Sequence, residues 1–269
     1  MKQRLIVAGI GIPVLLLILL ACPAWATAAM CALLSAVGCY ELMHAVGGEE
    51  WKRLAPLTVA SGALAFCAGH GIIDGMALMA WVFLTVVYVF ATAIVTHGKP
   101  GAVSFKTDMA GLFGALALPL GFASLAMLRD LSAAVVLAPF VGAFMSDTGA
   151  FFAGRAFGKR KLAPAVSPNK TVAGCIGGFV GSIAGMAVFH LVVKTWFQLD
   201  LGWGVVILMG VIGSLFGQLG DLSFSVIKRE FGIKDYGTIF PGHGGVLDRF
   251  DSVLFVSPAY LLFLLFFFA

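Results

Sequence analysis

The sequence predicts an all-α polytopic integral membrane protein that forms a single membrane-embedded domain over residues 1–269. Of its 269 residues, 61% are hydrophobic and 11% are charged, and the mean hydropathy is +1.03. A chain this apolar has no polar faces left to meet water. Its successive apolar runs are long enough to cross roughly 30 Å of hydrocarbon. The sequence therefore excludes a water-soluble core and indicates spanning helices.

Nine apolar segments are expected to span the membrane. The first follows Lys2 and Arg4 and imitates a secretory signal with a cleavage site at 24–26, but Pro23 and the apolar segment after it favour a retained helix. The first and third segments are short for a span. The nine segments are Leu5–Leu20, Ala24–Val46, Leu54–Gly69, Met76–Thr96, Met109–Leu128, Ser132–Phe157, Val172–Phe197, Trp203–Ile227 and Phe250–Ala269.

The distribution of basic residues gives an independent check on this count. With a cytoplasmic N-terminus, 15 of the 17 Lys and Arg residues fall on the inner side, and only Arg129 and Lys194 fall outside. Lys and Arg are enriched in cytoplasmic loops of membrane proteins. We therefore expect the charged loops 155–170 and 228–249 to face the cytoplasm.

Polar residues divide the chain into two regions. Residues 1–131 are expected to form N-terminal helices with short loops, and residues 132–269 to form the catalytic helices and the cytoplasmic loops. Glycines from Gly174 to Gly185 follow a small-residue spacing that permits close helix contact, so we interpret them as packing residues. Five scattered cysteines have no C-x-x-C spacing and indicate no disulfide framework.

The first group of candidate functional residues lies at the end of the segment that begins at Trp203. Asp221, Ser225 and Lys228 are spaced i, i+4 and i+7, which places them on one face of a helix. An acid inside a membrane helix must be paired or must face an aqueous cavity. A structural pair with Arg229 or another Arg is one interpretation of Asp221, and metal ligation is the interpretation that we favour.

A glycine-rich stretch and two acids follow. Asp248 and Asp251 lie three residues apart at the expected start of the last helix, and would share one face. Acids in a first helical turn are also favoured by the helix macrodipole alone. The preceding segment 241–245, Pro-Gly-His-Gly-Gly, cannot be a regular helix. Its backbone N–H groups are expected to form an anion-binding concavity next to the helix N-terminus.

A second group surrounds the loop between the sixth and seventh segments. Asp147 lies within a helix, and the loop ends in Ser-Pro-Asn-Lys-Thr at 167–171. Hydroxyl groups and a lysine at a helix N-terminus suit a phosphate group, although the P-loop spacing is absent. The basic run 159–161 is expected to anchor the loop to anionic lipid headgroups. Farther upstream, Glu41 and His44 form a polar pair that we interpret as interior packing, and the other histidines before the last loop are isolated.

The stretch from Ser225 to Asp251 follows the pattern S-x-x-K-R-x-x-x-x-K-D-x-G-x-x-x-P-G-H-G-G-x-x-D-R-x-D. This pattern, together with D-T-G-A-F-F-A-G-R-x-F-G-K and S-P-x-K-T upstream, resembles the phosphatidate cytidylyltransferases, or CDP-diacylglycerol synthases. Bacterial members are similar in length and topology. Two positions depart from the family pattern: Ala173 stands where Glu is usual, and Tyr236 where a small residue is common.

The resemblance implies a nucleotidyltransferase of phospholipid biosynthesis, which converts CTP and phosphatidic acid into CDP-diacylglycerol and pyrophosphate. It also implies Mg²⁺ as cofactor, with a second metal ion as an open alternative. The implied partners are CTP, phosphatidic acid, membrane lipids and a second copy of the chain in a homodimer, and no nucleic acid is expected. The resemblance also implies a protein of the bacterial inner membrane whose site faces the cytoplasm.

Individual residues receive expected roles from the same resemblance. Asp221 and Asp248 are the expected metal ligands, with Asp251 and Asp147 in support, and Lys228 and Arg229 are catalytic candidates beside them. The candidate binders of substrate or phosphate are Ser167, Lys170, Ser225, Lys234, His243, Gly244, Gly245 and Arg249.

Three alternatives remain open. Another CTP-dependent lipid cytidylyltransferase or a polyprenol kinase would use similar groups on a different lipid. An ion-coupled transporter would place its charges near the membrane midplane in repeated, broken helices. Here the charges cluster towards one membrane face, which favours an enzyme.

Overall fold

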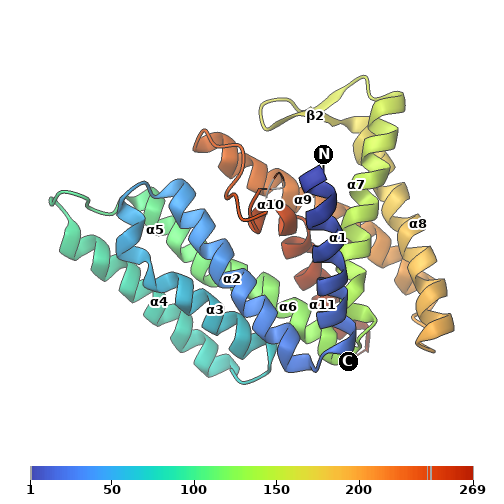
Figure 1. Cartoon of the computed structure of the whole chain (residues 1–269), viewed down its shortest axis with the longest axis horizontal. Coiled ribbons are helices and arrows are strands. Elements are labelled where there is room, and N and C mark those ends of the chain that lie inside the picture. The colour runs from blue at the N-terminus through green and yellow to red at the C-terminus, as the bar shows by residue number, and fades with distance from the viewer. Residues whose placement is uncertain (1, 241, 243, 269) are drawn as a thin grey trace. The chain divides into compact units, whose positions relative to one another are not determined.

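The computed structural model describes residues 2–240, 242 and 244–268. Helices make up most of the described chain, and one short β-hairpin interrupts them (Figure 1). The prediction of an all-α polytopic membrane protein is therefore confirmed. His243, one of the candidate phosphate binders, lies outside the described residues.

Each of the nine expected segments contains a helix, but the helices differ in length and some begin or end inside the expected bounds. Among the described residues, six helical stretches are long and apolar enough to cross a membrane. The remaining three segments form shorter apolar helices at Gly9–Ala21, Pro56–Gly69 and Val253–Phe267. The nine-span count and the orientation of the N-terminus stay predictions. The six long stretches are Ala24–Val46, Gly75–Thr96, Phe105–Leu131, Val135–Phe157, Val172–Trp196 and Trp203–Glu230.

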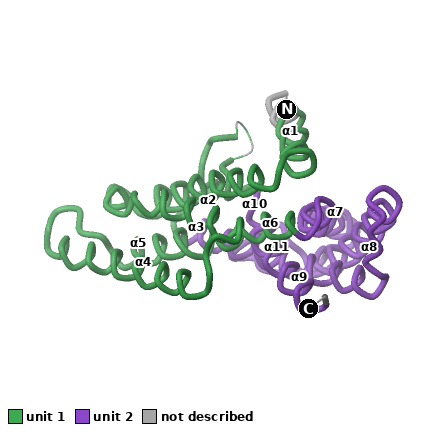
Figure 2. The backbone as a smooth tube through the Cα atoms, turned by 90° about the horizontal axis from the view of Figure 1, so that it is seen from below, with its two compact units in different colours: residues 1–130, 231–249 green, residues 131–230, 250–269 purple. Residues whose placement is uncertain are grey.

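The backbone divides into two compact units, which Figure 2 colours separately. Unit 1 contains residues 1–130 and 231–249, and unit 2 contains residues 131–230 and 250–269. The long motif that begins at Ser225 is therefore shared: its first residues end a helix of unit 2, and its glycine-rich part belongs with the N-terminal helices.

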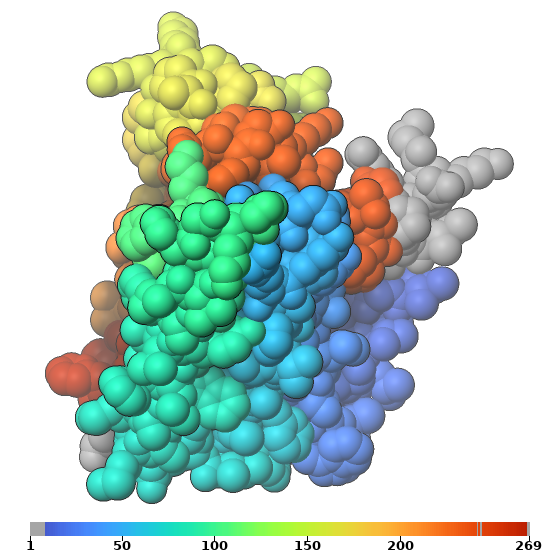
Figure 3. Space-filling model, turned by 90° about the vertical axis from the view of Figure 1, so that its left-hand side faces the viewer, coloured from blue at the N-terminus to red at the C-terminus, as the bar shows by residue number. Residues whose placement is uncertain are grey.

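Unit 1 is a set of helices whose starts follow from local sequence. Pro56 occupies the first turn of α3, where its missing N–H is not needed. The side chain of Asp74 accepts a hydrogen bond from the Ala77 N–H at 2.7 Å and caps α4. Helix α4 is apolar and mostly exposed, and Figure 3 shows it (teal) at the surface. The helices of unit 1 are α1 (Lys2–Leu16), α2 (Ala24–Val46), α3 (Pro56–Gly69), α4 (Gly75–Thr96), α5 (Phe105–Leu112), α6 (Leu118–Leu131) and most of α10 (Leu247–Phe250).

Unit 2 contains the longest helices and the hairpin. Helices α7 and α8 approach so closely that a Cβ added at Gly181 would lie 2.9 Å from the Gly149 Cα. This confirms the prediction that the glycines after Thr171 serve close helix packing. Its elements are α7 (Ala138–Phe157), β1 (Lys161–Ala163), β2 (Ser167–Thr171), α8 (Val172–Trp196), α9 (Trp203–Glu230) and α11 (Val253–Phe268).

The end of the chain differs from the prediction in one respect that bears on the site. Helix α10 stops at Phe250, and Asp251 and Ser252 form a turn before α11 begins at Val253. The Asp251 carboxylate accepts the N–H of Ser252 at 2.7 Å, which stabilises this turn. The prediction that Asp248 and Asp251 share one face of a continuous helix is therefore wrong.

Candidate active site

An ion pair between α9 and the hairpin marks the candidate site of unit 2. The Lys170 Nζ lies 2.5 Å from the Asp221 Oδ2, and each side chain is about one-quarter exposed, at 24% and 28%. One turn later in α9, the Ser225 hydroxyl donates to the Asp221 Oδ1 at 3.3 Å, as the i, i+4 spacing predicts. The partner of Asp221 is thus a lysine rather than the arginine that the sequence offered as its structural alternative.

The hairpin positions Lys170. Strands β1 and β2 pair antiparallel, and the Arg229 Nε donates to the Val166 carbonyl oxygen in the hairpin at 3.2 Å. Directly after Lys170, the Thr171 hydroxyl accepts the Gly174 N–H at 3.0 Å and caps α8. Lys170 therefore lies between the capped N-terminus of α8 and the hairpin turn that Arg229 contacts. Arg229, expected to bind phosphate, has a defined structural contact in the hairpin.

Two further acids share the electrostatic environment of Asp221. Burial, followed by the negative charge of Asp221, raises the pKa of Asp251 to about 7. The Asp147 charge acts in the same direction, and the Lys228 ammonium opposes both. The negative charges of Asp221 and Asp147 both act on Asp251, so three of the four acids that the sequence singled out influence one another in unit 2.

A cavity of about 620 Å³ opens beside this group. Its lining includes Asp147 and Lys170 together with Arg155 from the end of α7. Acidic and basic side chains in one cavity suit a ligand that carries phosphates with their counter-cations. The cavity is large enough to receive a substantial part of a nucleotide or a lipid headgroup.

Gln218 also lines this cavity and was missed by the sequence analysis. Its Nε2 donates to the Ser214 Oγ at 2.8 Å and to the Cys175 carbonyl oxygen at 3.2 Å. The Ser214 hydroxyl is in turn 2.9 Å from that of Ser146, next to Asp147 in α7. An amide in an otherwise apolar helix is the signal that would have identified Gln218.

In unit 1, backbone N–H groups at 236 and 245–247 surround two buried carboxylates. The Asp248 Oδ2 accepts the N–H of Tyr236 at 2.8 Å and that of Gly245 at 3.0 Å, and Asp248 is only 9% exposed. Glu41 of α2 accepts the N–H groups of the next two residues, Val246 and Leu247. Carboxylates of the protein itself therefore accept the N–H groups of Tyr236, Gly245, Val246 and Leu247. The binding of a substrate anion by the segment 241–245 stays a prediction.

Glu41 is the second residue whose role the sequence analysis missed. It was interpreted as interior packing paired with His44, but its carboxylate faces the glycine-rich segment, while the His44 ring stacks on Tyr40 at 5.6 Å and is exposed. The prediction that Glu41 and His44 form a polar pair is therefore wrong. A single acid inside an apolar helix was the available signal, because such acids are usually functional.

The other candidate phosphate binders lie on accessible parts of each unit. Lys234 and Arg249 are exposed in unit 1, and Ser167 is half-buried in β2 of unit 2. Gly244 has a φ of +86°, and a Cβ added there would lie 2.7 Å from the Asp248 Oδ2. Only glycine fits this position without strain. Their phosphate-binding roles stay predictions.

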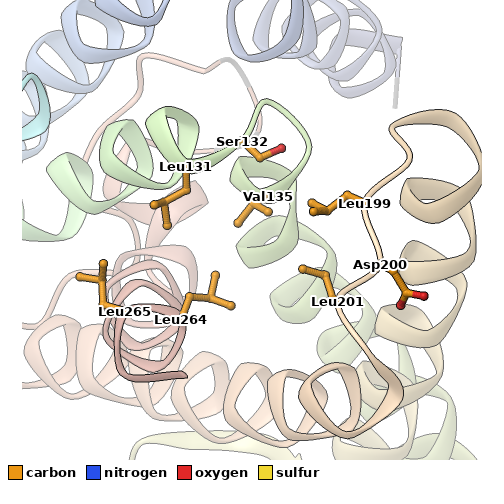
Figure 4. A pocket seen from close by; sticks show the side chains of 8 residues that line it. All are labelled: Leu131, Ser132, Val135, Leu199, Asp200, Leu201, Leu264 and Leu265. Atoms are coloured by element: carbon orange, nitrogen blue, oxygen red, sulfur yellow. The ribbon is translucent and has the colours of Figure 1, made fainter. Parts of the chain in front are cut away.

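A second cavity, of about 310 Å³, lies at the opposite end of the helices of unit 2 (Figure 4). Six of its eight lining residues are Leu or Val, and the charged member, Asp200, pairs with Lys194 at 2.6 Å. This lining suits hydrocarbon rather than phosphate, so we place the chemistry at the hairpin end.

The acids of unit 2 bear on which metal ion could bind. Across residues 2–240, 242 and 244–268, no three His, Cys, Asp or Glu side chains meet closely enough to form a ready-made metal cage. Mg²⁺ is usually held by one or two carboxylates together with substrate phosphates and waters. Asp221, Asp147 and Asp251, whose charges act on one another, are a donor set of this kind.

Comparison with known proteins identifies the family. A sequence model described as the cytidylyltransferase family matches residues 2–267. The chain belongs to the cytidylyltransferase family. The match includes both units, and it confirms the resemblance carried by the motif from Ser225 to Asp251.

Individual relatives of this cytidylyltransferase carry a more specific name, phosphatidate cytidylyltransferase. The protein from Staphylococcus saprophyticus is 44% identical over 139 residues, which cover 52% of each chain. The Bacillus subtilis protein is 51% identical over 120 residues, covering 45% of this chain and 43% of the relative. The protein from Staphylococcus aureus strain COL is 51% identical over 126 residues, or 46% of each. The chain spans about half the length of these relatives.

Proposed function

We propose that this protein is a phosphatidate cytidylyltransferase, which transfers CMP from CTP to phosphatidic acid and releases pyrophosphate. The observation that carries the proposal is the Lys170–Asp221 pair at a cavity that also presents Asp147 and Arg155. Membership of the cytidylyltransferase family supports the use of CTP. The names of the relatives support phosphatidic acid as acceptor.

The reaction needs no nucleophile from the protein. An oxygen of the phosphatidic acid phosphate is already anionic at neutral pH, since the second pKa of a phosphate monoester is about 6. This oxygen forms a bond to the α-phosphorus of CTP. The bond from that phosphorus to the oxygen bridging to the β-phosphorus breaks, and pyrophosphate leaves with the electron pair. The main barrier is the repulsion between two polyanions and the charge that builds on the leaving group.

Positive side chains of unit 2 address that barrier. Lys170, which the hairpin holds, and Arg155 both line the cavity. We propose that both attract the phosphates, and that Lys228, which acts electrostatically on Asp251, stabilises the departing pyrophosphate. Fixed donors that need no rearrangement during the reaction are effective stabilisers of developing charge.

Mg²⁺ is the proposed cofactor. Asp221 and Asp248 are each proposed as a ligand of Mg²⁺, with Asp251 and Asp147 in support. A bound Mg²⁺ would neutralise part of the charge on the CTP phosphates and on pyrophosphate. Replacing Asp221 or Asp248 by Asn should nearly abolish turnover in a folded protein, because Asn keeps the shape and loses the charge. Wild-type activity of Asp248→Asn at limiting Mg²⁺ would contradict the ligand role of Asp248.

The remaining parts of the proposal concern the membrane. We propose that the cavity and the hairpin face the cytoplasm, that the lipid headgroup enters laterally from the cytoplasmic leaflet, and that the protein forms a homodimer. Because the acyl chains stay in the bilayer, a lateral route avoids their transfer through water.

Labelled CTP tests the proposed reaction directly. Purified full-length protein in neutral detergent is given phosphatidic acid and CTP labelled on either the α- or the γ-phosphorus. A cytidylyltransferase places the α-label in the lipid and the γ-label in pyrophosphate. A lipid kinase places the γ-label in the lipid, and a transporter transfers neither. Polyprenol and archaeol-type acceptors in parallel reactions separate the neighbouring enzymes, and label transfer to one of them but not to phosphatidic acid would overturn the proposed substrate.

A further inference from the structure

Glu41 makes an unusual pair of contacts within unit 1. Its Oε1 accepts the Val246 N–H at 2.9 Å, and its Oε2 accepts the Leu247 N–H at 3.0 Å. The residue is 2% exposed. Both oxygens are therefore used by two consecutive backbone donors, and hydrogen bonds to a charged acceptor are stronger than neutral ones. These contacts join α2 to the start of α10, 205 residues later in the chain.

Gly237 and Gly245 leave space for the Glu41 carboxylate. A Cβ added at Gly237 would lie 2.9 Å from the Glu41 Cδ, and one added at Gly245 would collide with the same carboxyl group. Real Cβ atoms essentially never approach other heavy atoms this closely. Two glycines of the motif are thus required by the position of Glu41, whatever they contribute to a ligand.

Asp248 fixes the same segment from within. Its Oδ2 accepts the N–H groups of Tyr236 and Gly245. Four N–H groups at 236, 245, 246 and 247 are therefore shared between two carboxylates. Loss of the Glu41 contacts would release the peptide units on either side of Val246, directly before the residue that the proposed function assigns to the cation.

We propose that Glu41 is a positioning residue, which holds residues 244–248 in the shape that presents Asp248 for the reaction. The inference rests on the proposed function for its catalytic consequence. A carboxylate is required because two adjacent donors need two acceptor oxygens. An amide offers one oxygen and turns an NH2 group towards the second donor.

The experiment uses the purified full-length protein in neutral detergent and compares three variants. Glu41→Gln keeps the shape of the side chain but loses one acceptor oxygen. Glu41→Asp keeps both acceptor oxygens on a shorter side chain. Ser35→Ala is the matched control, since Ser35 is also buried in α2 and its hydroxyl lies 2.8 Å from that of Ser61, away from the segment. All are assayed well below their unfolding temperatures, so that differences in folded fraction do not contribute.

Two readouts are taken: kcat for CTP and phosphatidic acid, and amide hydrogen exchange of peptides that cover 244–250. We expect Glu41→Gln to lower kcat by about 100-fold, the order expected when a reacting group is displaced by about 1 Å. Amide protection of these peptides should fall at the same time. Glu41→Asp should recover part of both, and Ser35→Ala should lower the unfolding temperature while keeping kcat within about threefold of wild type.

The outcomes separate this inference from the proposed function. An inactive wild-type protein would contradict the proposed function, and amide exchange would still decide whether Glu41 holds the segment. An active wild type with unchanged exchange and unchanged kcat in Glu41→Gln would overturn the inference alone. Loss of activity in parallel with the unfolding temperature, and equal in Ser35→Ala, would also overturn it, because Glu41 would then act only on stability.

Discussion

Removing Lys170 should destabilise unit 2 and thereby show how strongly Asp221 depends on its partner. At 2.5 Å, two unit charges attract by roughly 6–7 kcal/mol at an effective dielectric constant of about 20. Desolvation of the two groups offsets much of this attraction. Breaking such a largely buried pair from one side should therefore cost about 2–3 kcal/mol, mainly because Asp221 is left unpaired beside other acids.

The assay is thermal unfolding of the full-length protein in neutral detergent, without nucleotide or divalent cation. A loss of about 2–3 kcal/mol corresponds to roughly 5–10 °C for a chain of this size. Asp221→Asn should cause a similar shift, and the double variant Lys170→Met, Asp221→Asn should lose clearly less than the sum.

An exposed ion pair in the same unit provides the control. Lys194 and Asp200 lie 2.6 Å apart with about half of each side chain exposed, so Lys194→Met should cost less than about 1 kcal/mol. Equal shifts for Lys170→Met and Lys194→Met, or strictly additive shifts in the double variant, would refute the reasoning. In that event the Lys170–Asp221 pair would contribute no more to stability than an exposed ion pair.

Three further predictions concern topology, charge and pH. In a cysteine-free background, a thiol reagent that cannot cross the membrane should miss single cysteines in the hairpin 161–171 of intact cells, and labelling from the periplasm would overturn the cytoplasmic assignment. In neutral detergent, Lys228→Ala with Arg229→Ala should stay severely impaired, whereas neutralising 159–161 should leave most activity; the opposite ranking would move the phosphate site to that basic run. The pKa of Asp251 is raised to about 7, against about 4 in an unfolded chain, so the folded state binds more protons between these values. Stability should therefore fall as the pH rises from about 4 to about 7 and level off above, and an unfolding profile of Asp251→Asn that keeps the same slope would contradict this account.

The helices were predictable because their signal is local. Long apolar runs mark the spanning segments, and the i, i+4 spacing of Asp221 and Ser225 correctly placed both on one face of α9. The hairpin 161–171 was not predicted, because its strands are only three and five residues long and carry polar side chains. The Arg229 contact that ties the hairpin to α9 through Val166 is likewise not revealed by any pattern within the hairpin.

The contacts around Glu41 show what a local motif leaves out. The glycine-rich pattern predicted backbone N–H groups that accept an anion, since consecutive glycines leave such groups accessible. The pattern could not indicate which anion, because Glu41 lies 205 residues before Val246 and no periodicity connects α2 to a non-helical loop. A buried carboxylate that the chain itself supplies satisfies the same donors that a substrate phosphate would. An acid that stands alone in an apolar helix is costly unless donors surround it, so Glu41 and the glycine-rich segment are each explained by the other.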